Sequence, residues 1–150
     1  MNHSHPVKHI NPALLVVLII VTCGFYAVYL LYRWIFAIND SCLVEKKIIN
    51  PWLAIILTLL SFGIAGIYFQ YEIVRNALNL ANEETPGSFA RSPLINPPKK
   101  NLKEIVLYGN IISFAAAIAS SGHLSFIPLI FDIWLILEIQ SAMEYSFGYE

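Results

Sequence analysis

The sequence has little charge, and three long stretches have none. Only 13% of its 150 residues are Asp, Glu, Lys or Arg, whereas 57% are hydrophobic and the mean hydropathy is +0.64. No acidic or basic residue occurs in residues 10–32, 48–71 or 105–131. Each stretch exceeds the roughly 20 residues that a helix needs to cross about 30 Å of hydrocarbon. A soluble protein of this size would have to bury all three, so the composition disfavours that class.

Other absences exclude several kinds of function. The net charge is −1, and the sequence has no basic, aromatic-rich patch and no glycine-rich phosphate loop, so nucleic acid is not an expected partner. The GxSxG and HExxH motifs of hydrolases are also missing. Cys23 and Cys42 show no CxxC spacing. We therefore expect neither an enzyme nor a cofactor-binding protein.

Three histidines, His3, His5 and His9, precede the first apolar stretch. Neutral imidazoles are common metal ligands. No cysteine or carboxylate accompanies these histidines, and chain termini are seldom ordered. We therefore predict no specific metal site there.

The first apolar stretch can also be interpreted as a cleaved signal peptide, in particular a lipoprotein signal that ends at Cys23. The residue before a lipidated cysteine is normally small, whereas this chain has Thr22. The apolar run also continues through Leu31, beyond the roughly 7 to 15 residues of a signal peptide's apolar region. A retained helix is the favoured prediction.

The first half of the chain contains an internal repeat. Ile-Asn-Pro at residues 10–12 recurs at 49–51, an offset of 39 residues (49 minus 10). The same offset aligns these pairs: Thr22 with Ser61, Gly24 with Gly63, Tyr29 with Tyr68, and Tyr32 with Tyr71. We define the repeat units as residues 10–39 and 49–79, and we expect the shared residues to serve packing.

Each part of the repeat unit has a physical role. Asn-Pro opens a helix, because proline in the first turn gives up only an N–H that would be unpaired anyway. An aliphatic run follows, and the hydroxyl residue and glycine at its end permit a kink or a close helix crossing. The aromatic residues beyond, which include Tyr29 and Tyr68, are typical of a membrane interface.

These motifs resemble those of a known family. The Asn-Pro opening, the sequence Thr-Cys-Gly-Phe-Tyr at residues 22–26 and the tyrosine-rich exit are similar to the small bacterial membrane proteins of domain of unknown function 4234, over about residues 10–79. The family motif reads Thr-Phe/Cys-Gly-Ile-Tyr, and the second unit departs from it at Ser61 and Ala65. The resemblance implies a multi-pass protein of the bacterial cytoplasmic membrane and supplies no activity.

The second half of the chain predicts a polar loop followed by a helical hairpin. Residues 80–103 are rich in proline and charged residues, as is typical of an exposed loop. Residues 104–145 form two largely apolar segments of helix length, separated by a Ser-Ser-Gly-His turn sequence. We predict one all-α membrane domain over residues 1–150 with about four transmembrane helices, at residues 12–34, 51–75, 104–121 and 124–145.

The fourth predicted helix carries an acidic residue, Asp132, in an apolar setting. A charge at mid-bilayer costs about 2.5–3.5 kcal/mol on the insertion scale, so Asp132 should face protein or water. Either it forms a functional polar site with Asn110, or it bonds Asn110 or Ser113 across the hairpin as a packing device. Four other charged residues are expected on solvated faces, the first two as an i, i+3 pair: Glu72, Arg75, Glu138 and Glu144.

The basic residues leave two topologies open. Four simple spans put six of the nine Lys and Arg residues on the side of both termini, which favours cytoplasmic termini. If the chain instead turned back at Gly24 and Gly63, all nine would share one side. Helical arms of about 12 residues would then rise only about 18 Å and end near mid-bilayer. The four-span topology is therefore favoured.

Two functions fit these features. The first is a structural or interaction bundle that binds the lipid bilayer, other copies of itself or other membrane proteins. Small residues such as Ser113, Ala116 and Ala117 would allow close helix packing in it. The second is a small transporter or proton relay centred on Asp132, because duplicated helical units are common in transporters. The absence of a catalytic set favours the first.

Overall fold

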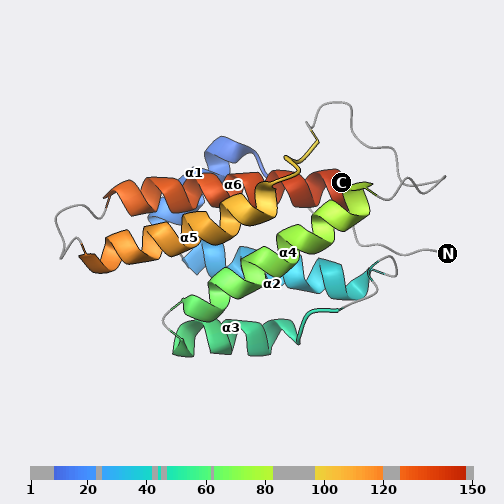
Figure 1. Ribbon diagram of the computed structural model, residues 1–150, viewed down its shortest axis with the longest axis horizontal. Coiled ribbons are helices and arrows are strands. Elements are labelled where there is room, and N and C mark those ends of the chain that lie inside the picture. The colour runs from blue at the N-terminus through green and yellow to red at the C-terminus, as the bar shows by residue number, and fades with distance from the viewer. Residues whose placement is uncertain are drawn as a thin grey trace.

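The protein is a bundle of helices arranged as three hairpins. The structure, a computed structural model, describes residues 9–22, 25–41, 44, 47–61, 63–82, 97–119 and 126–147. These residues form six α-helices and no strand, which confirms the all-α prediction. In chain order the helices are α1 (Pro12–Val21), α2 (Phe25–Asp40), α3 (Pro51–Leu60), α4 (Ile64–Asn82), α5 (Leu102–Ala119) and α6 (Phe126–Phe147) (Figure 1).

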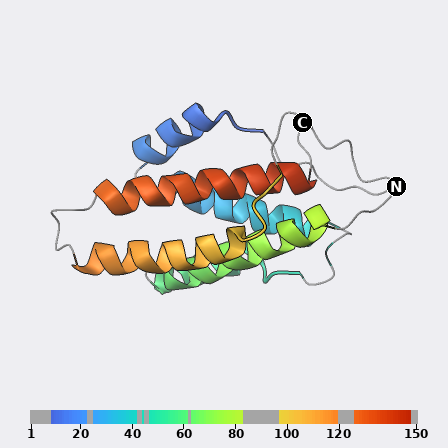
Figure 2. The same cartoon turned by 45° about the horizontal axis from the view of Figure 1, so that its top comes forward.

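The predicted helices 12–34 and 51–75 are each two helices rather than one. α1 ends at Val21 and α2 begins at Phe25, while α3 ends at Leu60 and α4 begins at Ile64. In both pairs the second helix runs back in roughly the opposite direction (Figure 2). The prediction of continuous helices was therefore wrong, because the chain reverses at the centre of each repeat unit.

Equivalent hydrogen bonds build the two reversals. The Thr22 hydroxyl donates to a carbonyl of α1 at 2.7 Å and accepts the backbone N–H of Tyr26 at 3.0 Å. The Ser61 hydroxyl donates to a carbonyl of α3 at 3.3 Å and accepts the N–H of Ala65 at 2.9 Å. One hydroxyl thus satisfies a carbonyl at the end of the first helix and an N–H at the start of the second.

The repeat also fixes where α1 and α3 begin. The side-chain oxygens of Asn11 and Asn50 each accept the backbone N–H two residues further on, at 2.9 Å. Proline follows both asparagines in the first helical position, where it lacks only an N–H that would have no helical partner. Asn-Pro therefore opens a helix at both predicted places.

Three long helices, α2, α4 and α6, form the centre of the bundle. α4 packs against α5 and α6, α2 contacts α4 and α6, and α5 also packs against α6. The shorter helices lie outside them: α1 contacts α2 and α6, and α3 contacts α2 and α4. The largest fully buried side chains of the central helices are Trp34, Leu30, Ile35, Ile38, Ile73, Leu135, Ile139 and Met143.

The three hairpins point the same way, so the molecule has two unlike ends (Figures 1 and 2). We define the turn end by these helix termini: Val21, Phe25, Leu60, Ile64, Ala119 and Phe126. We define the open end by these: Pro12, Asp40, Pro51, Asn82, Leu102 and Phe147. Residues 25–32 of α2, 64–71 of α4 and 105–119 of α5 carry no charge, and neither α1 nor α3 carries any. Asp132 is thus the one helical charge close to the turn end in the described part of the chain.

One described helix is long and apolar enough to cross a membrane. It is α5, with a mean hydropathy of 1.5, and 22% of it is buried inside the protein. α1 and α3 are also apolar but have only 10 residues each. Among the described helices, α5 alone therefore meets both requirements.

Gly63 is the residue whose backbone the second reversal requires. Its φ is +93°, and a Cβ added there would meet no atom within 4 Å. We expect Gly63→Ala to lower the free energy of unfolding by about 1–2 kcal/mol, because an L side chain is strained at positive φ. Gly63→Asn should cost less, because asparagine tolerates positive φ better. Chemical unfolding of the purified protein measures both losses, and equal losses would contradict this explanation.

Candidate functional site

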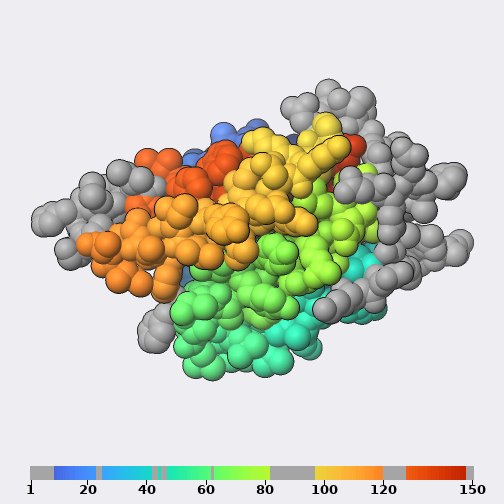
Figure 3. Space-filling view, viewed as in Figure 1, coloured from blue at the N-terminus to red at the C-terminus, as the bar shows by residue number. Residues whose placement is uncertain are grey.

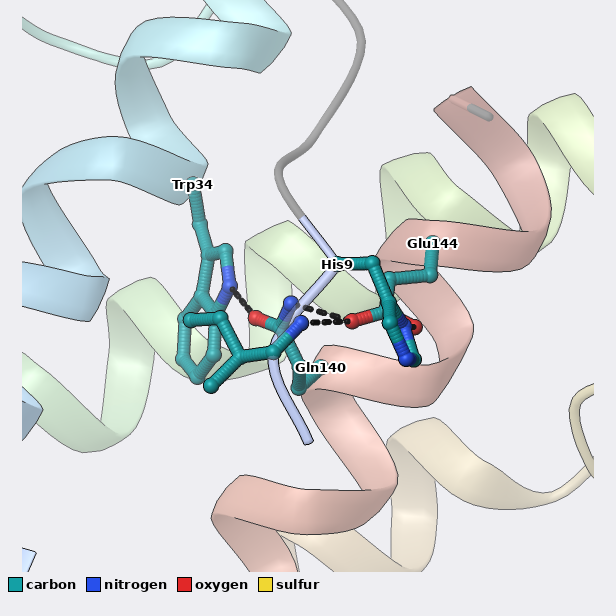
Figure 4. A network of polar contacts seen from close by, with 5 residues as sticks. His9, Trp34, Gln140 and Glu144 are labelled. Atoms are coloured by element: carbon teal, nitrogen blue, oxygen red, sulfur yellow. Dashed lines mark hydrogen bonds and ion pairs between the residues drawn. The ribbon is translucent and has the colours of Figure 1, made fainter. Parts of the chain in front are cut away.

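A buried polar network joins the first hairpin to α6 (Figure 4). Gln140 and Glu144 lie one turn apart on α6 and are 4% and 6% exposed. The Gln140 amide donates to Glu144 Oε1 at 2.7 Å, and its oxygen accepts the indole N–H of Trp34 at 2.8 Å. Trp34 is itself 1% exposed. A hydrogen-bonded chain therefore runs from α2 into α6 through the core.

The segment that precedes α1 completes this network. The backbone N–H of Ile10 donates to Glu144 Oε1 at 3.3 Å, and Nδ1 of His9 lies 2.9 Å from Glu144 Oε2. We define the Glu144 network by its five residues: His9, Ile10, Trp34, Gln140 and Glu144. Figure 4 shows the imidazole and the amide approaching the carboxylate from different sides.

The chemistry of the Glu144 network fits a structural role. A carboxylate buried to this degree is costly unless hydrogen bonds satisfy it, and here a side-chain amide, a backbone N–H and an imidazole surround it. These contacts connect the segment before α1 and the interior of α2 to one helix, α6. The network thus holds three separate parts of the chain together.

The described residues do not form a metal centre. Among the described residues, no group of three or more His, Cys, Asp or Glu side chains could hold a metal ion. His9 lies against Glu144. His3 and His5, the other histidines considered for metal binding, lie outside the described residues.

The prediction of solvated faces was wrong for two of the four charged residues. Glu144 and Glu72 are 6% and 9% exposed, because both lie on the inner sides of their helices. The side chains of Arg75 and Glu138 are 46% and 26% exposed, and Arg75 pairs with Glu72 at 3.3 Å as expected. The spacing of Gln140 and Glu144, four apart in an apolar helix, was the available signal for a buried polar pair.

Asp132 bonds across the α5–α6 hairpin rather than to Asn110. Its Oδ1 accepts the hydroxyl of Ser113 at 2.7 Å; Ser113 is buried and Asp132 is half-buried. The Asn110 amide donates instead to Gln70 Oε1 and to the carbonyl of Val106, both at 2.8 Å. The predicted site of Asp132 with Asn110 is therefore not assembled, and Ser113 is the packing partner.

The repeat-motif residues lie at the turns and on the surface. Thr22, Ser61 and Gly63 make the reversals described above, while Gly24 lies outside the described residues. The tyrosines Tyr29 and Tyr68 are 47% and 55% exposed. They are surface residues on α2 and α4.

Close approach of α5 to α6 depends on a glycine rather than on the alanines. A Cβ on Gly109 would lie 2.7 Å from a ring carbon of Phe131, so only glycine fits without a shift. Ala116 and Ala117, which were expected to permit close packing, are exposed. The small-residue face of α5 thus contacts α6 at Gly109 and Ser113.

No protein-family model, no curated protein sequence and no solved structure matches this chain. The resemblance of residues 10–79 to domain of unknown function 4234 therefore stays a prediction. Function has to be inferred from the geometry itself.

Removal of the Glu144 carboxylate tests the structural role of the network. We expect Glu144→Ala to lower the free energy of unfolding by about 2–3 kcal/mol, because the Gln140 amide and the Ile10 N–H lose their acceptor in the core. Glu104→Ala is the matched control: its side chain is 49% exposed and lies 3.7 Å from Lys103, so the change should stay within about 0.5 kcal/mol. Chemical unfolding of both variants measures the difference, and similar losses would refute the role of the network.

Proposed function

We propose that this protein is a structural or interaction component of the bacterial cytoplasmic membrane, inserted into the bilayer from one side as three helical hairpins. It carries no catalytic site in this proposal. The observation that carries the proposal is the large amount of apolar side-chain surface that the folded chain leaves exposed.

The exposed apolar surface is most complete on α3. Only Ala54 of its ten residues is buried, while Trp52 is 65% and Leu60 is 73% exposed. α1 and α5 expose similar side chains, such as Val21 at 73% and Ile118 at 69%. Burying a Leu or Ile side chain is worth roughly 1.5–3 kcal/mol, so such a surface favours lipid or another protein over water.

The distribution of charge supports insertion from one side. Apart from Asp132, the charges of the three hairpins lie toward the open end. The uncharged part of α5, residues 105–119, is about 22 Å long at 1.5 Å per residue. The ten residues of α1 or α3 rise about 15 Å, so these hairpins would end near mid-bilayer. The described lysines that precede helices, Lys47, Lys99 and Lys100, lie before α3 and α5 at the open end, which by the positive-inside rule faces the cytoplasm.

The turns have the hydrogen bonding that such depth requires. Backbone groups in hydrocarbon must be satisfied within the protein. The N–H groups of Gly63, Ile64 and Ala65 donate to Thr58, Ser61 and the Ser61 hydroxyl, at 2.8 Å, 3.2 Å and 2.9 Å. Within the described residues, no buried side-chain nitrogen or oxygen lacks a partner. The hydrogen bonds of Gly63, Ile64 and Ala65 therefore support a turn of the chain inside a membrane.

The proposed one-sided insertion can be tested by cysteine labelling in intact cells. In a variant with Cys23 and Cys42 replaced by serine, single cysteines are placed at Lys47 or at Lys99. We expect both to react with a membrane-impermeant maleimide only after the cells are permeabilised, because both residues lie at the cytoplasmic end.

A cysteine at Ile112, which is 66% exposed on α5, is the control and should stay unreactive in lipid. Four full spans would place positions 47 and 99 on opposite sides. Labelling of position 47 alone from outside intact cells would therefore refute the one-sided insertion.

A second candidate function, an ion or proton relay, rests on Asp132, the charge nearest the turn end. Asp132→Asn keeps an oxygen that accepts the Ser113 hydroxyl, so we expect a stability change within about 0.5 kcal/mol. Asp132→Leu removes the acceptor and should cost about 1–3 kcal/mol. Ion flux into proteoliposomes separates the two functions: a structural role predicts no flux that depends on Asp132, whereas loss of a measured flux in Asp132→Asn would favour the relay.

A further inference from the structure

A pocket of about 290 Å³ lies between the segment before α5 and the middle of α6. Its walls include Pro98 and Lys99 on one side and Trp134, Glu138 and Ser141 on the other. Lys99 Nζ lies 3.1 Å from Glu138 Oε1 and 5.5 Å from the centre of the Trp134 ring. The pocket therefore presents an ammonium group, a carboxylate and a hydroxyl beside an indole ring.

The pocket lies where the surface of α6 changes from apolar to charged. Toward the turn end α6 exposes Leu129 and Ile130, and toward the open end the partly exposed carboxylate of Glu138 follows. This inference rests on the proposed one-sided insertion, in which that boundary is at the level of the lipid headgroups. Tryptophan is typical of this level, and a lysine side chain can extend along apolar surface to reach it.

We propose that this pocket binds a phosphoethanolamine group, the headgroup of a zwitterionic phospholipid with a primary amine. The Lys99 ammonium contacts the phosphate, while the Glu138 carboxylate and the Ser141 hydroxyl accept N–H groups of the amine. The two charges of the headgroup then alternate with the two charges of the protein pair. The side chains of Lys99 and Glu138 are 55% and 26% exposed, so both are within reach of such a ligand.

The same groups disfavour two other common headgroups. An anionic phosphoglycerol group brings no cation to Glu138, so the Lys99 ammonium alone has to compensate both the carboxylate and the phosphate. A phosphocholine group brings a cation, but its quaternary nitrogen has no N–H to donate to Glu138 or Ser141. Selectivity for the primary amine therefore depends on Glu138.

Native mass spectrometry of the full chain in detergent tests this selectivity. The probes are phosphatidylethanolamine, phosphatidylglycerol and phosphatidylcholine with identical acyl chains. We expect one phosphatidylethanolamine to bind at least about fivefold more tightly than either of the others. Glu138→Gln should reduce this preference to within about twofold, whereas Glu104→Gln, a carboxylate outside the pocket, should leave it unchanged.

Equal affinity for the three lipids, or a preference that survives Glu138→Gln, would overturn the proposal. Soluble phosphoethanolamine distinguishes a lipid site from a site for the free compound: displacement of the lipid at equal concentration would overturn the lipid assignment, and retention of the lipid supports it. Flotation of the same protein with vesicles separates this inference from the proposed function. A chain that floats but shows no headgroup preference rejects only the pocket, and a chain that does not float rejects both.

Discussion

The reversal of the chain at Thr22 and at Ser61 is the constraint on which the rest of the structure depends. At each point one hydroxyl satisfies a carbonyl at the end of an apolar helix and an N–H at the start of the next helix. The reversal returns the polar second helix of each unit to the end where the first began. Because both units do this, their charges gather at the open end beside those of α5 and α6.

In this arrangement the outer helices provide the exposed apolar surface and the central helices form the core. The outer helices α1 and α3 are almost purely apolar and present most of their surface outward (Figure 3 shows α3 along one edge of the molecule). The central helices bury one another, and polar contacts join them to each other and to α5: Trp34 with Gln140, Ser146 with the carbonyl of Ala77, and Gln70 with Asn110 of α5. Hydrogen bonds in an apolar bundle fix which helices are neighbours more than hydrophobic contact does, because hydrophobic contact is non-directional. The exposed apolar surface is then free to meet lipid or another protein.

The sequence predicted the features that depend on neighbouring residues. Asn-Pro marks the starts of α1 and α3, and the predicted helix 104–121 matches α5 within two residues at either end. The reversals were not predicted as the main topology, because a hydroxyl residue followed by glycine is compatible with a kink as well as with a turn. Apolar periodicity along α1 and α2 does not report the direction in which the second helix leaves.

The candidate site was the least predictable part, because it joins residues far apart in the chain. Trp34 and Gln140 are separated by 106 positions, and His9 and Glu144 by 135. Glu144 near the end of an apolar helix has the sequence pattern of an interfacial residue, and only the fold places it under the segment before α1. Asp132 was identified from its apolar setting, but its partner, Ser113, was one of two choices that the spacing allowed.

The distance between the start of α3 and the end of α4 tests the reversal most directly. Leu53 and Asn79 are both exposed, and spin labels attached there report this distance in liposomes by pulsed electron–electron double resonance. A hairpin with helices about 10 Å apart predicts a separation below about 25 Å. A continuous helix between the two positions would place them about 39 Å apart at 1.5 Å per residue, and a distance near that value would contradict the account.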